Sequence, residues 1–512
     1  MANKVYSCSI SALQCQIIEV EAAITNGLPY FSIIGLADRS VQESKERIRL
    51  SIKNSNLKFP AQRKTINLAP TEIRKHGANL DLSIAIALLI ESKQVQTINL
   101  NDSIFIGELG LDGKLKPING VIAIAQHIAE QGFKKLFLPK ENAKEASFIN
   151  NIEIYPINSL KQILGFLNQK TKIKQTTKYN LDREFTNVQN LSPFYISQIA
   201  GLKREKRALS IAATGGHNIL LKGPPGSGKT LLARAVVELL PKMTKEEILE
   251  SSKIFSISGL VNHDFPLIIK RPFREVHHSS TLKSIIGGGP NPKPGEISLA
   301  HNGVLFFDEI SEFSKPILEA MRQPLENKFI QINRVHKSLK YPSNFLFIGT
   351  MNPCPCGYNN NEKVKCICST WQIKNYQKKL SGAILDRFDI FLDVDNIKFN
   401  DFYENQDLRE YENLIKKINN AYNIQINRFK NNPLIKRNRD MQLKDIKNYC
   451  KFTNTAYKLL KQAHQKLNLS NRGYLNAIKL AQTIGDLEES EKIKSTHIAE
   501  AMQYRTKNDN LL

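Results

Sequence analysis

Gly223-Pro224-Pro225-Gly226-Ser227-Gly228-Lys229-Thr230 is the stretch of sequence that decides the fold of the central part of the chain. It follows an apolar run at residues 217–222, which predicts a buried strand, and precedes residues 231–240, which are good helix formers. A strand, a glycine-rich loop and a helix in this order are typical of a phosphate-binding loop. The glycines let successive backbone N–H groups point at phosphate oxygens at the start of the helix. The stretch therefore predicts an α/β core that binds a nucleoside triphosphate.

Two side chains of this loop have roles that phosphate chemistry predicts. The Lys229 ammonium is expected to lie against the β and γ phosphates, and the Thr230 hydroxyl to ligate Mg²⁺. ATP and Mg²⁺ are therefore the expected cofactors. The alternative is a glycine-rich turn with an incidental lysine, which the flanking strand and helix disfavour.

A second apolar run, at residues 303–307, ends in two acids, Asp308 and Glu309. The carboxyl ends of parallel strands meet at one edge of a sheet, so both carboxylates are expected beside the phosphate-binding loop. Asp308 suits the Mg²⁺ shell, and Glu309 suits orienting and deprotonating a water molecule. Such a glutamate argues for hydrolysis rather than transfer to a second substrate. The other interpretation is an acidic strand end that only caps the residues after it.

A third apolar run, at residues 344–351, ends at Asn352, whose amide could hold the attacking water or contact the γ-phosphate. Further on, Arg387 directly precedes the segment Phe388-Asp389 and another apolar run at residues 390–392. An ion pair of Arg387 with Asp386 or Asp389 is one interpretation of this arginine.

Four motifs together resemble the ComM/YifB family of magnesium-chelatase-like AAA+ ATPases. They are the phosphate-binding loop, Leu-Phe-Phe-Asp308-Glu309, Gly-Thr-Met-Asn352-Pro-Cys-Pro-Cys-Gly-Tyr and Leu-Asp-Arg387-Phe-Asp, and the resemblance extends from about residue 5 to about residue 505. It implies an α/β fold class, in which an AAA+ P-loop core with a parallel sheet is joined to an N-terminal α+β domain of the S5/Lon type and a C-terminal α-helical lid.

The same resemblance implies roles for two arginines. In relatives such as the MCM helicases, the arginine that corresponds to Arg387 reaches the nucleotide of the neighbouring subunit, so Arg387 is expected to be an arginine finger. The family also has a sensor arginine in a Ser-x-Arg segment of its helical lid, and Arg472 in Ser-Asn-Arg472 corresponds to it. Close relatives carry further arginines in the lid, but this chain has Asn476, Lys479 and Gln482 at those positions. The sensor role is therefore expected only for Arg472.

The first third of the chain resembles the proteolytic domain of Lon in residues 105–120. The positions of the Lon serine nucleophile and lysine base correspond to Asn79 and Ile124. An amide cannot replace the hydroxyl nucleophile and isoleucine cannot accept a proton, so the resemblance implies an inactive domain or an interaction module. The expected domains are residues 1–168 (Lon-like), 169–190 (a polar linker), 191–396 (ATPase core) and 397–512 (helical lid).

The chain is basic, with 72 Lys and Arg against 48 Asp and Glu and a formal net charge of +24. This charge suits nucleic-acid binding, but many of the lysines could be solvated surface residues. The segment 328–343 alternates around a polar turn, which predicts a β-hairpin, and Arg334, Lys337 and Lys340 are its candidate DNA contacts. In related ring helicases a hairpin at this place points into the central channel and grips the nucleic-acid backbone. A second insert, residues 277–296, has the composition of a loop and could reach the same channel. Either segment could equally be a surface excursion.

Four cysteines lie close together in the sequence and could bind one structural Zn²⁺ as thiolates. They are Cys354, Cys356, Cys366 and Cys368, and the alternative is that they are small buried thiols that shape a loop.

Cysteine content and hydropathy indicate the compartment of the protein. The chain has seven cysteines, an odd number that argues for a reducing compartment. We find no stretch suited to a membrane span and no secretion signal, and therefore expect a cytoplasmic protein without a membrane partner.

The resemblance implies a function on DNA. A hexameric ring would drive branch migration or unwinding of recombination intermediates during natural transformation, with DNA, further copies of the chain and recombination proteins as its partners. The alternative is a chelatase-like or chaperone-like ATPase that remodels a protein or cofactor complex. Stimulation of ATP hydrolysis by forked or four-way DNA would distinguish the two.

Overall fold

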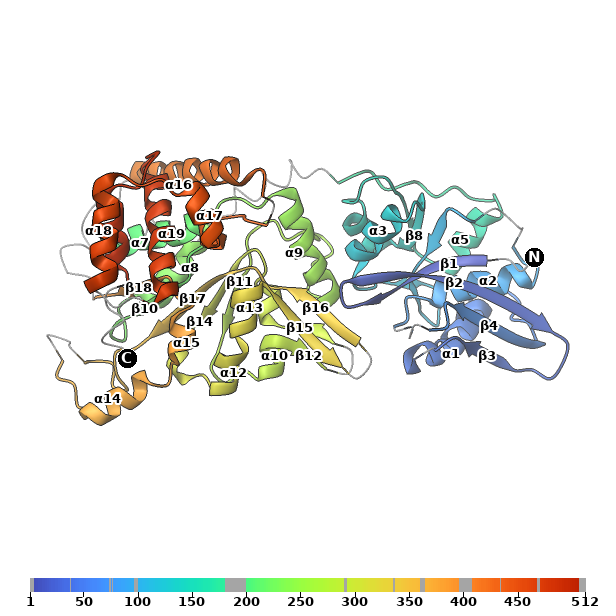
Figure 1. Cartoon of the computed structure of the whole chain (residues 1–512). Coiled ribbons are helices and arrows are strands. Elements are labelled where there is room, and N and C mark those ends of the chain that lie inside the picture. Colours follow the sequence, from blue (N-terminus) through green and yellow to red (C-terminus); the bar gives the residue numbers. More distant parts are fainter. Residues whose placement is uncertain are drawn as a thin grey trace. The chain divides into compact units, whose positions relative to one another are not determined.

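The structure, a computed structural model, describes residues 4–36, 38–72, 75, 77–95, 100–179, 199–289, 292–334, 337–359, 364–395, 408–432, 434–466 and 470–505 (Figure 1). The chain divides into two compact units. The N-terminal unit comprises residues 1–189, 245–269 and 292–294, and the C-terminal unit comprises residues 190–244, 270–291 and 295–512.

The N-terminal unit is built on a mixed seven-stranded sheet in the order β3-β4-β2-β1-β5-β8-β9. Strands β1, β2 and β4 pair antiparallel, and the other pairs are parallel. The strands are β1 (Lys4–Ser11), β2 (Gln14–Thr25), β3 (Phe31–Ile34), β4 (Arg63–Ala69), β5 (Ser103–Phe105), β8 (Lys135–Pro139) and β9 (Glu153–Ile157), with a small separate ribbon of β6 (Glu108–Leu109) and β7 (Leu115–Lys116).

Helix α2 (Asp81–Glu91) forms the centre of this unit's core. Its sequence is apolar on nearly every side, and each residue from Asp81 to Ile90 is buried, as expected for a helix without a polar face. The other helices are α1 (Arg39–Asn54), α3 (Val121–Glu130), α4 (Lys140–Ala146), α5 (Leu160–Leu167) and α9 (Lys245–Ser258). This α+β arrangement confirms the predicted type of the N-terminal domain.

Helix α9 comes from the middle of the predicted ATPase sequence but packs in the N-terminal unit, against α3. The buried Glu145 carboxylate accepts hydrogen bonds from Ser256 of α9 and from Asn142. The Gly120 N–H donates to the Ser256 carbonyl at 3.1 Å. Residues 245–269 therefore fold with residues 1–189, although residues 190–244, which separate the two segments in the chain, belong to the other unit.

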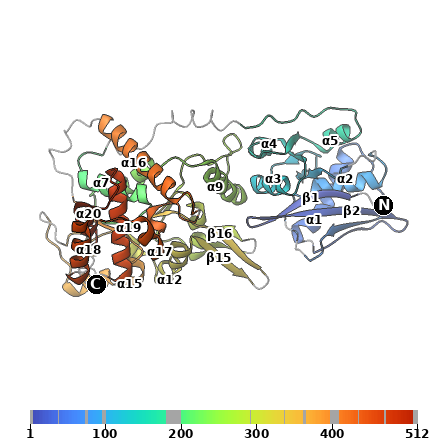
Figure 2. The same cartoon turned by 45° about the horizontal axis from the view of Figure 1, so that its top comes forward.

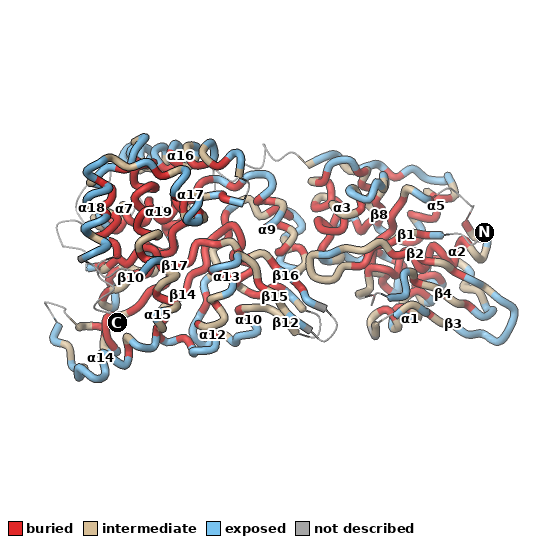
Figure 3. Tube along the Cα trace, viewed as in Figure 1, coloured by how far each residue is buried: buried red, intermediate tan, exposed pale blue. Residues whose placement is uncertain are grey.

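The C-terminal unit contains a five-stranded sheet in the order β11-β14-β17-β10-β18, in which every pair is parallel. The strands are β11 (Phe273–Val276), β14 (Val304–Phe307), β17 (Leu346–Met351), β10 (Ile219–Lys222) and β18 (Ile390–Asp393). Both β14 and β17 are buried at every residue (Figure 3). Continuous apolar strands of this kind are typical of a parallel sheet covered on both faces, and the predicted α/β core is confirmed.

Helices before, between and after the strands complete the C-terminal unit. Those of the core are α7 (Lys203–Gly215), α8 (Lys229–Leu239), α11 (Glu296–Leu299), α12 (Lys315–Ala320), α13 (Arg322–Asn327), α14 (Thr370–Gln377) and α15 (Gly382–Leu385). Those of the predicted lid are α16 (Leu408–Phe429), α17 (Leu443–Tyr449), α18 (Asn454–Lys466), α19 (Asn471–Leu487) and α20 (Ser495–Gln503), which gather together in two views (Figure 1 and Figure 2). The lid is helical as expected, and one hydrophobic cluster joins α19 to β10 and β17.

The two inserts of the core differ in how well the sequence predicts them. The segment 328–343 forms the expected antiparallel hairpin of β15 (Phe329–Arg334) and β16 (Lys337–Pro342). The insert at 277–296, expected as a loop, contains a short helix, α10 (Leu282–Ile286), followed by β12 (Gly287–Gly288) and β13 (Lys293–Pro294). Much of the predicted linker, residues 180–190, lies outside the described residues, and no described helix is long and apolar enough to cross a lipid bilayer.

Candidate nucleotide site

The phosphate-binding loop connects β10 to α8 and depends on its glycines for two different reasons. Gly226 and Gly228 have φ angles of 76° and 86°, in the left-handed region, and the space where a Cβ would lie is open at both. Gly223 is required by close packing, because a Cβ there would lie 2.2 Å from the Val394 carbonyl oxygen. The loop therefore has the conformation that turns backbone N–H groups toward an anion at the start of α8.

The acids at the end of β14 lie beside this loop, as the sequence predicts. The Thr230 hydroxyl lies 3.5 Å from Asp308 Oδ2, which joins the first turn of α8 to the end of β14. Glu309 follows with a φ of 51° and is exposed, at the start of a 3₁₀ turn, Ile310–Glu312. A glutamate whose backbone lies in the left-handed region is uncommon, and residues held in this conformation concentrate at functional sites.

Thr350, on β17, is a further residue of the site and is not among those predicted from the sequence. Its hydroxyl donates a 2.5 Å hydrogen bond to Asp308 Oδ1 and accepts one of 2.9 Å from the Glu309 N–H. Thr350 is fully buried, so this hydroxyl is a fixed part of the site. A polar residue within an otherwise apolar strand, two positions before Asn352, is the signal that could have identified it.

Lys229 connects the loop to the third strand. Its ammonium donates to the carbonyls of Gly223 and Pro224 at 2.8 and 2.7 Å, and lies 3.4 Å from Asn352 Oδ1. Burial lowers the pKa of Lys229, and the charges of Asp308 and Glu309 oppose this shift. The structure thus brings together the loop, both acids and Asn352 at one edge of the sheet.

The donors at this edge fit ATP and Mg²⁺. A threonine hydroxyl and a carboxylate are oxygen ligands of the kind that Mg²⁺ prefers, and Thr230 and Asp308 would hold the ion. Lys229 and the N–H groups of residues 226–230 would bind the phosphates. Bound Mg²⁺ would neutralise charge on the phosphates during their cleavage.

Arg387 and Arg472 meet at a different place in the unit, on the carboxylate of Glu326 from α13. Arg387 pairs with Glu326 Oε1 through Nη2 and donates from Nη1 to the Ala383 carbonyl at 2.7 Å. Arg472, in the first turn of α19, lies 3.1 Å from the same Glu326 oxygen. The pKa of Arg387 is lowered by burial and by the charge of Arg472. The ion-pair partner of Arg387 is therefore Glu326 rather than Asp386 or Asp389, although the charge of Asp386 also favours the protonated arginine.

The candidate DNA-binding hairpin is described only in part. Arg334 and Lys337 face each other as the last pair of the β15–β16 ladder, but their side chains lie outside the described residues. Lys340 is exposed, and its ammonium lies 4.9 Å from the centre of the Phe329 ring. The hairpin lies in the chain between β14 and β17, the two strands that Glu309 and Asn352 follow.

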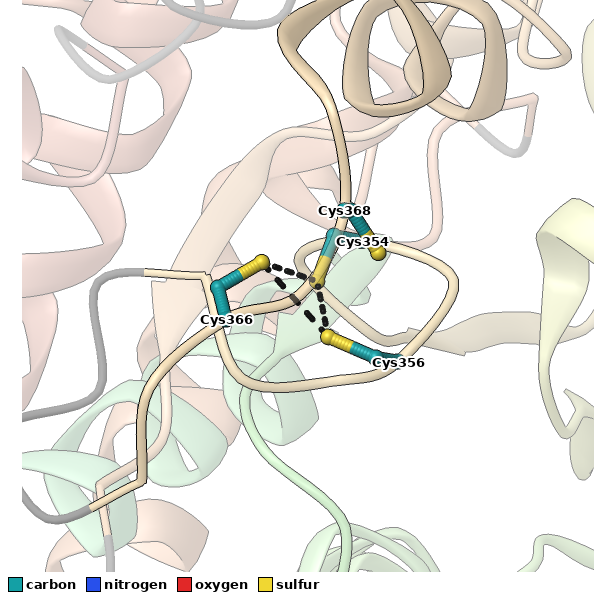
Figure 4. A group of neighbouring side chains, drawn as sticks. All are labelled: Cys354, Cys356, Cys366 and Cys368. Carbon is teal, nitrogen blue, oxygen red and sulfur yellow. Dashed lines mark hydrogen bonds between the residues drawn. The ribbon is translucent and has the colours of Figure 1, made fainter.

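The four cysteines that follow Asn352 lie together, with their side chains pointing toward one another (Figure 4). The Sγ atoms of Cys354, Cys356 and Cys366 are 3.4 to 3.6 Å apart, and all four sulfur atoms lie within 4.8 Å of one another. Cys354 is buried, and the other three are intermediate in exposure. Backbone N–H groups of Tyr358 and Ile367 lower the pKa of Cys356 to about 6. This donor set fits a tetrahedral thiolate metal site, whose sulfurs are about 3.8 Å apart when Zn–S bonds are about 2.3 Å long.

The positions of the Lon catalytic pair have structural roles in the N-terminal unit. The Asn79 amide donates to the Cys8 carbonyl at 2.6 Å and is buried. Ile124 is fully buried in α3. Both side chains thus take part in the packing of the N-terminal unit.

A phosphate-binding loop, paired acids and a polar amide at adjacent ends of parallel strands, followed by a helical lid, define a P-loop ATPase of the AAA+ class. Three family models match the chain: "Subunit ChlI of Mg-chelatase" at residues 20–142, "Magnesium chelatase, subunit ChlI" at 195–402 and "Magnesium chelatase, subunit ChlI C-terminal" at 410–505. The chain is 37% identical to the competence protein ComM of Haemophilus influenzae over 98% of this chain and 97% of that one. It is also 36% identical to YifB of Escherichia coli, over 95% and 94%, and 27% identical to Lon protease 2 of Bacillus subtilis, over 29% and 28%. The chain belongs to the ComM/YifB family of magnesium-chelatase-like AAA+ ATPases.

Proposed function

We propose that this ATPase is a DNA motor, which acts in the cytoplasm as a hexameric ring and drives branch migration or unwinding of recombination intermediates during natural transformation. Its partners would be DNA, further copies of the chain and recombination proteins. Support comes from similarity along almost the whole chain to a relative whose name assigns it to competence. The observation that carries the proposal is the basic hairpin inserted between the strands of Glu309 and Asn352.

The residues of the nucleotide site would divide the work of hydrolysis. Lys229 would bind the β and γ phosphates, while Thr230 and Asp308 hold Mg²⁺. Glu309 would accept a proton from the attacking water, with its main chain fixed by Thr350. Asn352 would contact the γ-phosphate or the water.

The ring is proposed because Arg387 would complete the site of a neighbouring copy. Arg387 and Arg472 bind the same oxygen of Glu326, so their positive charges are already gathered at one place. A γ-phosphate from the next subunit could replace Glu326 as their anionic partner. Positive charge at that point would stabilise the transition state of phosphate cleavage.

The hairpin would connect hydrolysis to DNA. The hairpin is joined to β17 through a short connection, residues 343–345, so a shift of β17 would be passed on to the hairpin. Arg334, Lys337 and Lys340 would neutralise backbone phosphates without regard to sequence. A DNA strand in the central channel of the ring is the proposed substrate.

A migration assay on a synthetic four-way junction with one labelled strand tests this proposal. We expect ATP-dependent conversion of the junction by the native chain and none by Glu309→Gln, which retains nucleotide binding. If the native chain hydrolyses ATP but neither moves the junction nor separates a fork, the proposal is wrong. The alternative, a chelatase-like or chaperone-like ATPase that remodels a protein or cofactor complex, is favoured by the matches to magnesium-chelatase subunits and would then replace it.

We also propose that Cys354, Cys356, Cys366 and Cys368 hold one structural Zn²⁺. Four thiolates complete a tetrahedral shell, so the ion would have no open position for catalysis. Elemental analysis of protein purified without chelator should give about one zinc per chain. Less than about half an equivalent would contradict this assignment.

A further inference from the structure

The segment from Met351 to Gly357 runs along the phosphate-binding loop and touches it at three points. The Met351 carbonyl accepts a 3.2 Å hydrogen bond from the Gly223 N–H. Asn352 Oδ1 lies 3.4 Å from the Lys229 ammonium. Gly357 packs on the ring of Pro225 so closely that a Cβ at Gly357 would lie 2.5 Å from Pro225 Cδ and 2.7 Å from Cγ. The end of β17 and the residues that follow it are therefore in direct contact with the phosphate-binding loop.

Two of the four clustered cysteines, Cys354 and Cys356, lie within this segment. Between them and Gly357 the chain makes a tight turn, in which the Gly357 N–H donates to the Cys354 carbonyl at 3.0 Å. The Asn359 N–H donates to Cys354 Sγ at 3.2 Å. The short turn leaves little independent freedom, so whatever fixes these two sulfurs also fixes Gly357 against Pro225.

The other two cysteines, Cys366 and Cys368, lie shortly before α14, which contacts the segments that follow Asn352 and Glu309. The Gln377 side chain donates to the Pro353 carbonyl at 3.2 Å. Ser311, which follows Glu309 by two residues, donates to the Tyr376 hydroxyl at 2.6 Å. Joining the two cysteine pairs would thus add a link between the chain before α14 and the Met351–Gly357 segment, beside the contacts that α14 already makes with Pro353 and with Ser311.

We propose that zinc bound by the four cysteines acts as a clamp that holds the Met351–Gly357 segment against the phosphate-binding loop, so that metal loading sets the affinity for nucleotide. This inference rests on the zinc assignment made above, but not on the action on DNA. Without the metal, the Gly357–Pro225 contact and the Asn352–Lys229 contact lose their support. The loop then samples conformations that do not bind phosphate, and nucleotide affinity falls.

The test measures zinc content and the Kd of a fluorescent ATP analogue with Mg²⁺, in the absence of DNA. Cys366→Ser/Cys368→Ser removes two ligands without changing the segment that touches the loop. Gly357→Ala retains all four cysteines but places a methyl group against Pro225. The matched controls are Cys15→Ser, a free cysteine outside the cluster, and Gly132→Ala, whose φ of 85° equals that of Gly357 and whose Cβ would meet open space.

We expect the double cysteine variant to hold less than about half an equivalent of zinc, and to bind the analogue about tenfold more weakly than the native chain. Gly357→Ala should retain its zinc and show a similar loss of affinity, while both controls match the native chain. Circular dichroism before each titration confirms that the variants are folded.

Two results would overturn the clamp. One is a zinc-free variant with native nucleotide affinity, and the other is Gly357→Ala with the affinity of Gly132→Ala. A native chain without zinc would overturn the metal assignment itself. None of these measurements contains DNA, so a failure of the proposed motor function would leave them unchanged and can be recognised separately.

Discussion

The hydroxyl of Thr350 donates a 2.5 Å hydrogen bond to the carboxylate of Asp308. The same hydroxyl accepts from the Glu309 N–H, so one buried side chain on β17 fixes both acids at the end of β14. Asp308 in turn lies against Thr230 of the phosphate-binding loop. The proposed metal-binding and water-activating residues are therefore connected through Thr350 to β17, the strand directly before Asn352.

Replacing Thr350 with valine should impair catalysis more than folding. Valine has nearly the same shape but lacks the hydroxyl, so the Glu309 N–H loses its partner, at a cost of about 1–3 kcal/mol if it is left unsatisfied. We expect kcat to fall at least about tenfold and the apparent affinity for Mg²⁺ to weaken. Thr350→Ser keeps the hydroxyl and should restore most of the activity. Steady-state hydrolysis across a Mg²⁺ series checks this, and a valine variant with the native rate would refute it.

Lys229→Ala and Glu309→Gln should separate binding from hydrolysis. Loss of the Lys229 ammonium removes a charged contact with the phosphates, worth about 1.5–3 kcal/mol, so nucleotide affinity should fall roughly 10- to 100-fold. Glu309→Gln should bind nucleotide normally but hydrolyse it about 100-fold more slowly or worse, because an amide cannot accept the proton. Fluorescent-nucleotide titration and single-turnover hydrolysis measure the two effects. The roles are wrongly assigned if Glu309→Gln turns over at the native rate.

Arg387→Ala should retain nucleotide binding and lose turnover, by about 10³-fold if it acts as an arginine finger. Mixing Arg387→Ala with Lys229→Ala chains should restore part of the activity. At mixed interfaces an intact Lys229 site would meet an intact Arg387 from its neighbour. Hydrolysis measured against the mixing ratio should therefore pass through a maximum. A flat or strictly additive curve would show that Arg387 does not act across an interface.

The docking of α9 in the N-terminal unit should weaken as pH rises. Burial raises the pKa of Glu145, and hydrogen bonds from Ser256 and Asn142 and the charge of His263 offset this only partly. The docking of α9 is thus stabilised in full below the pKa that Glu145 has in the unfolded chain. This stabilisation is lost as the pH rises through the higher pKa that Glu145 has in the folded chain. It amounts to about 1.4 kcal/mol for each unit by which the fold raises the pKa.

Hydrogen exchange of α9 measured from about pH 4 to pH 8, corrected for intrinsic rates, follows this change. Glu145→Gln removes the titrating group, so its protection of α9 should be nearly independent of pH. Equal pH dependence in the native chain and in this variant would exclude Glu145 as the cause.

Local patterns in the sequence predict the strands around the nucleotide site and the hairpin, but not the helix in the insert 277–296. The apolar runs before Gly223, Asp308 and Asn352 predict three strands, and in a parallel sheet their ends must share an edge. The alternation around residues 335–336 predicts the hairpin.

Contacts between distant segments could not be predicted in this way. Glu326 meets Arg387, 61 residues later, and Arg472, 146 residues later, and no local period reports such a meeting. The packing of α9 with the N-terminal unit likewise depends on Glu145, more than a hundred residues away. The sequence marks Thr350 only as a polar residue in an apolar strand, and the contact of its hydroxyl with Asp308 depends on the sheet register.

The proposed coupling of ATP hydrolysis to DNA held by the hairpin is tested most directly by the hydrolysis rate with and without forked DNA. The native chain should be stimulated several-fold. Arg334→Glu/Lys337→Glu should retain the basal rate but lose the stimulation, because reversed charges repel the phosphate backbone. Hydrolysis by the native chain that no linear, forked or four-way DNA increases would contradict the account.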